Sequence, residues 1–131
     1  MSNEWKDWFV DVMTELHDKM WETYFLPDGW VNTFIPNMKI ELANILGNYV
    51  YDFVVRSLKE KYGVLRIYWT WEDRDYNENE REDIEKLTQE INHIINKYEC
   101  ISNNTCVVCG EPATKMTTGW IVPVCDNHEY L

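Results

Sequence analysis

Four side chains near the end of the chain have the types and spacing of a structural zinc site. Cys106 and Cys109 form one Cys-x-x-Cys pair, and Cys125 and His128 form a second pair after fifteen intervening residues. Thiolate sulfur and imidazole nitrogen are the ligands of tetrahedral structural zinc, and two short pairs are its sequence signature. Gly110 follows the first pair and can adopt the positive φ of a turn around a metal. The spacing therefore predicts one structural Zn2+ ion.

A site with four protein ligands leaves no open position for water or a substrate, which predicts a structural rather than a catalytic metal. Such a metal would stabilise a C-terminal segment that is too short to bury a core of its own. The alternative is a set of reduced, buried thiols, with His128 as an ordinary surface imidazole. Cys100 is the reserve ligand if His128 does not bind the metal.

Composition limits the class of protein and of partner. The 131 residues suit one domain, and 23 acidic against 12 basic residues give a net charge of −11. This charge disfavours general binding to a phosphate backbone and favours basic partners. Seven tryptophans and eight tyrosines are many for this length, so some should lie at the surface, where such residues often anchor partners.

The expected compartment is the cytoplasm. Cysteines at metal-binding spacing indicate a reducing environment. The N-terminus is acidic and amphipathic instead of a basic leader followed by an apolar run, so we expect no signal peptide. No apolar run has the length of a membrane span, so we expect no membrane association.

Apolar periodicity predicts the elements that position these residues. Apolar side chains at three- and four-residue steps predict helices over about 3–25, 36–62 and 80–99, with Gly63 capping the second. Alternation over 64–71 predicts a strand, whose expected partner is 31–35 or 120–122. The predicted fold is α+β and mainly helical, with three helices, a small β-sheet and a C-terminal zinc knuckle or ribbon. Residues 1–99 would form the body and 100–131 a zinc module packed on it, as one compact domain.

Two acidic segments are candidates for binding a partner. Six acids at helical spacing share one face of the first predicted helix: Glu4, Asp7, Asp11, Glu15, Asp18 and Glu22. A second group lies in the loop before the last predicted helix: Glu72, Asp73, Asp75, Glu78 and Glu80. The alternative for the first group is an ordinary solvated helix face. The alternative for the second group is that acids are favoured at the N-terminus of the following helix.

The residues of acid–base and nucleophilic catalysis do not form a recognisable pattern. No nucleotide-binding glycine loop occurs, and neither His17 nor His93 has a nucleophile at motif spacing. No two carboxylates are paired in an apolar stretch, as acid–base work would require. We therefore expect that the protein is not an enzyme.

One part of the chain resembles a known family. Residues 59–68, Lys-Glu-Lys-Tyr-Gly-Val-Leu-Arg-Ile-Tyr, are similar to the KEKFG-x-LRFY segment of short tailed-phage and prophage proteins. The likeness continues through Cys106, Cys109 and Gly110, a Gly-Trp pair at 119–120 and Cys125, so it covers about residues 56 to 128. Tyr62 stands where the family has Phe. The resemblance implies a phage origin and a zinc-ended α+β fold, but no mechanism. With a phage origin, the expected cytoplasm is the host bacterial cytosol.

Three functions fit these features. The first is a phage-encoded inhibitor of a bacterial defence complex, such as an anti-CRISPR, that occupies a basic nucleic-acid-binding surface as a DNA mimic. Its partner would be a basic host protein or a nucleoprotein complex such as a CRISPR effector. The alternative is a zinc-ribbon scaffolding module of phage metabolism without an inhibitory role. Direct nucleic-acid binding ranks last, because Lys115 is the only basic residue from 100 to 131.

Overall fold

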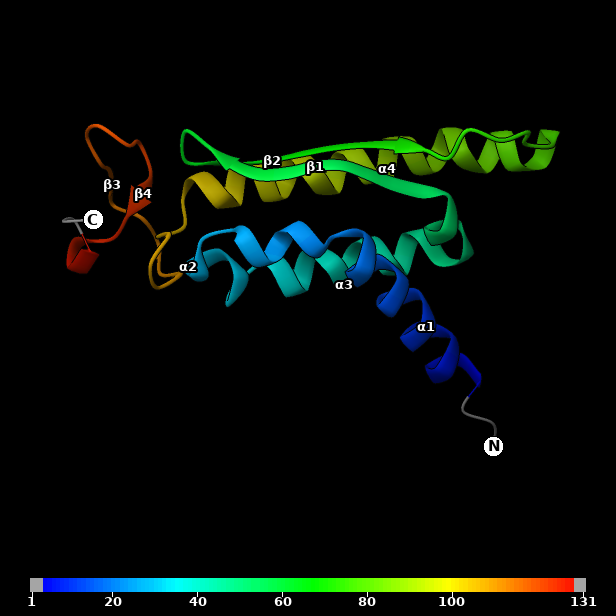
Figure 1. Ribbon diagram of the computed structural model, residues 1–131, viewed down its shortest axis with the longest axis horizontal. Coiled ribbons are helices and arrows are strands. Elements are labelled where there is room, and N and C mark those ends of the chain that lie inside the picture. Colours follow the sequence, from blue (N-terminus) through cyan, green and yellow to red (C-terminus); the bar gives the residue numbers. More distant parts are fainter. Residues whose placement is uncertain (1–3, 129–131) are drawn as a thin grey trace.

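The chain folds into helices and a long β-hairpin around one core (Figure 1). The computed structural model describes residues 4–128, with side chains described from residue 7 on. The α-helices are α1 (Glu4–Lys19), α2 (Asp28–Val31), α3 (Ile35–Leu46) and α4 (Glu78–Asn103), and the 3-10 helices are η1 (Trp21–Phe25), η2 (Gly47–Asp52) and η3 (Asp126–His128). The strands are β1 (Phe53–Lys61), β2 (Val64–Trp71), β3 (Lys115–Met116) and β4 (Pro123–Val124). The predicted α+β class is confirmed.

The predicted second helix is wrong beyond Leu46. At Gly47 the backbone turns to φ 52°, which ends α3, and the chain continues as η2 and then as β1. The apolar residues after this point suit a helix or a strand equally well by spacing. The choice is made by pairing, because β1 forms an antiparallel ladder with β2, with Leu58 opposite Ile67.

Gly63 caps no helix, which corrects the second expectation for this region. Tyr62 and Gly63 both have positive φ, 53° and 80°, and connect β1 to β2 as the two-residue turn of a hairpin. The partner of β2 is therefore its neighbour in sequence. Residues 31–35 lie at the end of α2 and the start of α3, and residues 120–122 precede β4, so neither pairs with β2.

The alternation predicted for residues 64–71 is observed. Leu65 and Ile67 are buried against the core, whereas Arg66 and Tyr68 are exposed. The inner face of the hairpin packs along α4, and α1 and α3 lie on the other side of the core (Figure 1). The hairpin therefore has one face in the core and one in solvent.

The third predicted helix is present and longer than expected. It begins after Asn77, whose side chain accepts a hydrogen bond from the backbone of Glu80 while the Glu80 carboxylate accepts one from Asn77, a capping box. Ile91, Ile95 and Tyr98 are buried along its inner face. Because α4 continues to Asn103, the expected boundary between residues 99 and 100 falls inside a helix.

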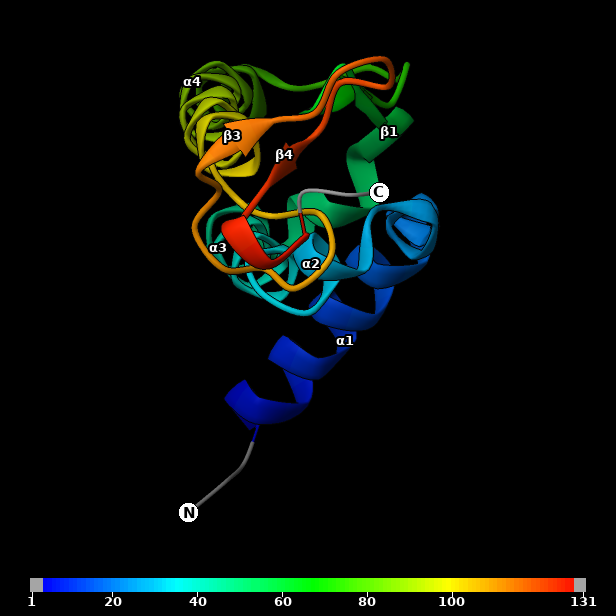
Figure 2. The ribbon, with the colours of Figure 1, turned by 90° about the vertical axis from the view of Figure 1, so that its left-hand side faces the viewer.

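The first predicted helix is confirmed over most of its length. It ends at Lys19, and η1 replaces its last turns. Val12, Leu16 and Met20 are buried, while the indole N–H of Trp8 donates to the side-chain oxygen of Asn48 at 2.8 Å. The N-terminal half of α1 extends away from the rest of the molecule (Figures 1 and 2).

Candidate metal centre

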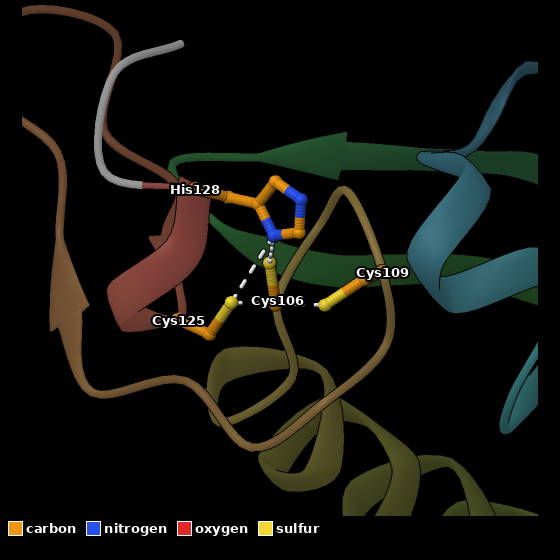
Figure 3. A group of neighbouring side chains, drawn as sticks. All are labelled: Cys106, Cys109, Cys125 and His128. Atoms are coloured by element: carbon orange, nitrogen blue, oxygen red, sulfur yellow. Dashed lines mark hydrogen bonds between the residues drawn. The ribbon is translucent and has the colours of Figure 1, made fainter.

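The four predicted ligands come together (Figure 3), at the end of the molecule farthest from the start of α1 (Figure 1). Their ligand atoms all lie within 4.8 Å of one another. The sulfur atoms of Cys109 and Cys125 are 3.7 Å apart. Nδ1 of His128 is 3.1 Å from the sulfur of Cys125 and 3.8 Å from that of Cys106. These residues could therefore hold one metal ion between them.

Two of these separations, 3.7 and 3.8 Å, match the edges of a metal tetrahedron, and the 3.1 Å between Nδ1 of His128 and the sulfur of Cys125 is shorter than such an edge. Metal–sulfur bonds of about 2.3 Å and metal–nitrogen bonds of about 2.0 Å place neighbouring ligand atoms roughly 3.5–3.8 Å apart. A disulfide would need a sulfur–sulfur distance of about 2.05 Å, so Cys109 and Cys125 are two separate thiols. Cys100 is exposed on α4 and is not part of the cluster, so the fourth group in it is His128.

Local backbone geometry aims the ligands inward. The turn at residues 107–109 follows Cys106, and the amide of Gly110 donates to the Cys106 carbonyl at 3.0 Å, closing the turn. Gly110 has φ 82°, as its place after the Cys-x-x-Cys pair predicts. The short ladder of β3 and β4 brings Cys125 back beside this turn, and η3 then places His128 over it.

Backbone dipoles favour the metal-binding form of one thiol. Burial raises the pKa of Cys106, but backbone N–H groups of Cys109 and Cys125 point at its sulfur and lower the pKa to about 6 overall. Donors that stabilise a thiolate also stabilise a metal–sulfur bond, because both place negative charge on the sulfur. The turn is therefore built to carry charge on Cys106.

Two glycines join the metal centre to the helical body. The amide of Gly29 in α2 donates to the carbonyl of Val107 at 2.8 Å. A Cβ on Gly29 would lie 2.1 Å from the carbonyl oxygen of Cys106, and a Cβ on Gly110 would lie 2.1 Å from the methyl carbon of Thr33. Backbone therefore packs directly on backbone at this junction, which neither glycine's sequence context signals.

We predict that Gly29→Ala destabilises the protein. The added methyl group would overlap the Cys106 carbonyl, so α2 and the metal-binding turn must separate, at a cost of roughly 1–3 kcal/mol or more. Chemical denaturation would measure the free energy of unfolding. Asn32→Ala is the control, because Asn32 is exposed just after α2. Equal stability of both variants would show that the junction can open without cost.

The structure places most acids of the first helix in solvent. Asp7, Asp11 and Asp18 are exposed, and Glu22 is half-buried in η1. Among the side chains from residue 7 to 128, only Lys19 forms an ion pair with an acid of α1, Glu15, at 3.6 Å. The side chain of Glu4 lies outside the described residues.

The second acidic segment divides into two roles. Glu72, Asp73, Asp75 and Glu78 are exposed. Glu80 instead serves the fold, because it forms the capping box and accepts from Arg74 at 2.8 Å. Arg74 also binds Asp52 at 2.7 Å and so ties the loop to η2. No sequence pattern signals this role of Arg74, which depends on how the loop lies against η2.

Comparison with known proteins adds no family to these observations. No protein-family model, curated protein or solved structure matches this chain. Within residues 4–128, no helix combines the length and the apolar character that crossing a membrane requires. The likeness of residues 59–68 to tailed-phage proteins therefore stays a prediction.

Proposed function

We propose that this protein is a phage-encoded inhibitor that binds a bacterial defence complex in the host cytosol, with a CRISPR effector as the leading example. The proposed contact is α1, whose row of carboxylates would occupy a basic surface that otherwise holds nucleic acid. The metal centre would be structural and would hold zinc. The observation that carries the proposal is an acidic helix whose N-terminal half extends from the body (Figure 2).

Zinc is proposed because of the ligand set. Three sulfurs and one imidazole in a tetrahedral arrangement are typical of structural zinc sites, and such soft donors disfavour magnesium and calcium. All four ligands come from the protein. The site then supplies stability to the C-terminal segment and offers no coordination position to a substrate.

The exposed acids support electrostatic recognition. Asp7, Asp11 and Asp18 lie on the side of α1 opposite the buried Val12 and Leu16, so their charges are open to solvent and accessible to the proposed partner. Each exposed pair contributes little to affinity by itself, but a row of like charges raises the rate of association with a basic groove. The net charge of −11 adds to this attraction at longer range.

Exposed aromatic residues next to α1 could supply the part of the affinity that salt does not screen. Trp21 and Phe25 in η1 are 56% and 78% exposed and pack edge-to-face, with ring centroids 5.7 Å apart. Tyr24 is 67% exposed, and its hydroxyl is 2.7 Å from Nε2 of His17. Large, rigid aromatic side chains of this kind often form the centre of an interface.

The test is inhibition of a purified CRISPR effector–guide RNA complex binding its target DNA. We expect wild-type protein to inhibit, and Asp7→Asn, Asp11→Asn and Asp18→Asn together to weaken inhibition at least tenfold. The weakening should shrink as salt rises, because exposed charges are screened beyond about 8 Å at physiological ionic strength. Unchanged circular dichroism would show that the fold is kept, since all three side chains are exposed.

The matched control removes three acids elsewhere. Glu82, Glu85 and Glu90 are exposed on α4, and their replacement by Gln changes the net charge by the same amount. Equal inhibition by both variants and wild type would remove α1 from the interface. If in addition no defence complex is bound, the zinc-ribbon scaffolding function becomes the leading proposal.

A further inference from the structure

The outer face of the β1–β2 hairpin gathers positive charge in a strongly acidic protein. Four of the 12 basic residues of the chain are exposed there, and they are Arg56, Lys59, Lys61 and Arg66. Lys59 and Arg66 lie directly opposite each other in the ladder, an arrangement that costs stability because like charges repel. A surface that accumulates such repulsion is suited to an anionic ligand.

Two carboxylates close to these cations have partners within the fold. Glu60 lies between Lys59 and Lys61 in sequence, but its carboxylate accepts from the backbone N–H of Gly63 at 2.9 Å. Glu99 of α4 contacts Arg66 at 3.7 Å, and 44% of the Arg66 side chain stays exposed. This long, exposed ion pair is weak and can be exchanged for another anion.

Exposed aromatic side chains lie among the cations. Tyr68 is 57% exposed on the same strand as Arg66, and Tyr62 at the turn is 71% exposed. Trp120 is 76% exposed and lines a hollow of about 270 Å³ together with Lys61 and Tyr62. Three aromatic side chains are thus open to solvent beside four positive charges.

The hairpin and the metal-binding segment form one surface at this point. The side-chain amide of Asn103 donates to the carbonyl of Gly63 at 3.2 Å. A Cβ on Gly63 would lie 2.8 Å from Met116 and 2.9 Å from Pro123, so the turn is packed tightly on the segment that carries Trp120. The fold therefore brings hairpin cations to a module whose own sequence, from 100 to 131, has Lys115 as its only basic residue.

We propose that this surface, made of Arg56, Lys59, Lys61, Arg66, Tyr62, Tyr68 and Trp120, binds single-stranded nucleic acid. Phosphates would contact the cations, and unpaired bases would stack on the aromatic rings, which is the usual division of roles in single-strand binding. A duplex fits less well, because its bases are already stacked on one another and are not free to stack on the aromatic rings. The site is separate from α1 and does not depend on the function proposed above.

Fluorescence anisotropy with a labelled oligothymidine of about twenty nucleotides tests the proposal. Each phosphate contact on a single strand changes the slope of log K against log[salt] by about −0.7, so four cations give roughly −3. Affinity should then fall roughly 50-fold between 50 and 200 mM salt. In the double variant Lys59→Gln with Lys61→Gln, affinity should fall only roughly 7-fold over the same salt range, and binding at 50 mM salt should be weaker than in the wild type. Trp120→Ala should weaken binding at least about 5-fold at both concentrations.

Matched controls separate the site from general charge. Arg81 and Lys86 are exposed on α4, so Arg81→Gln with Lys86→Gln makes the same charge change away from the hairpin and should leave binding unchanged. Equal losses in both double variants, or no binding to oligothymidine at 50 mM salt, would overturn the proposal. Duplex DNA bound as tightly as the single strand would overturn it too. So would polyglutamate competing as well as the oligonucleotide, since an acidic protein partner would then fit better.

Discussion

Elemental analysis of the purified protein is expected to find close to one zinc ion per chain, and Cys109→Ser is expected to release it. Zinc binding contributes roughly 10–16 kcal/mol in isolated zinc-finger peptides, so losing even a quarter of this would be a large part of the stability of a small domain. A loss of ~3 kcal/mol would lower the melting temperature by roughly 10 °C. Cys109 is exposed, so the effect would come from the metal and not from a packing defect.

Cys100→Ser is the matched control for this experiment. Cys100 is also an exposed cysteine, but it lies on α4 outside the ligand cluster. This variant should keep the metal and the melting temperature. A protein that is metal-free as purified and melts at the same temperature with Cys109→Ser would reduce the four residues to ordinary thiols and an imidazole. If one ion of another metal per chain were found, the prediction of a metal site would hold and the assignment of zinc would be wrong.

Trp30→Ala is expected to lower the free energy of unfolding by about 3–5 kcal/mol. Trp30 in α2 is fully buried and is the largest fully buried side chain among residues 7–128. Its indole N–H donates to the carbonyl of Thr105 at 3.1 Å, one residue before Cys106 of the candidate metal centre. Truncation would leave a cavity at the junction between the helical body and the metal centre, and would leave that carbonyl unpaired.

Two further variants make the Trp30 result specific. Trp30→Phe keeps most of the buried surface and removes the hydrogen bond, so it should cost about 1–3 kcal/mol. Trp21→Ala removes a tryptophan that is 56% exposed and should change stability by no more than about 0.5 kcal/mol. Denaturant titration of all three variants would measure these differences. A Trp30→Ala cost as small as that of Trp21→Ala would mean that the junction is not part of the cooperative core.

The sequence alone was sufficient for features that depend on residues close together in the chain. The Cys-x-x-Cys pair with Gly110 forms a turn because its ligands and its positive φ lie within five residues. The alternation in β2 and the apolar stripe of α1 were also predicted correctly, because each reflects the repeat of a single element. A helix or strand that buries one face shows this repeat in its own residues, so no information about its neighbours is needed.

Residues 47–61 could not be assigned from the same kind of pattern. Their apolar residues fit a helical face, so the helix was predicted to continue. Unlike β2, β1 has no clean two-residue alternation, and its register with β2 shifts between Val55 and Ser57. In the structure, Gly47 ends α3 and the ladder with β2 satisfies the backbone hydrogen bonds of β1. Gly63 was the available signal, because a glycine between two apolar segments also suits a two-residue hairpin turn, here formed by Tyr62 and Gly63.

Tertiary structure also decided which charges share a surface. The cluster of Cys106, Cys109, Cys125 and His128 was predictable from the sequence, because its members are spaced regularly along 23 residues, 106–128. The cations of the hairpin lie within residues 56–66. Gly63 packs on the segment that carries Trp120, and this contact brings the hairpin and Trp120 together. Close packing of this kind depends on the shape of two distant segments at once, so composition and net charge, which average over the chain, do not reveal it.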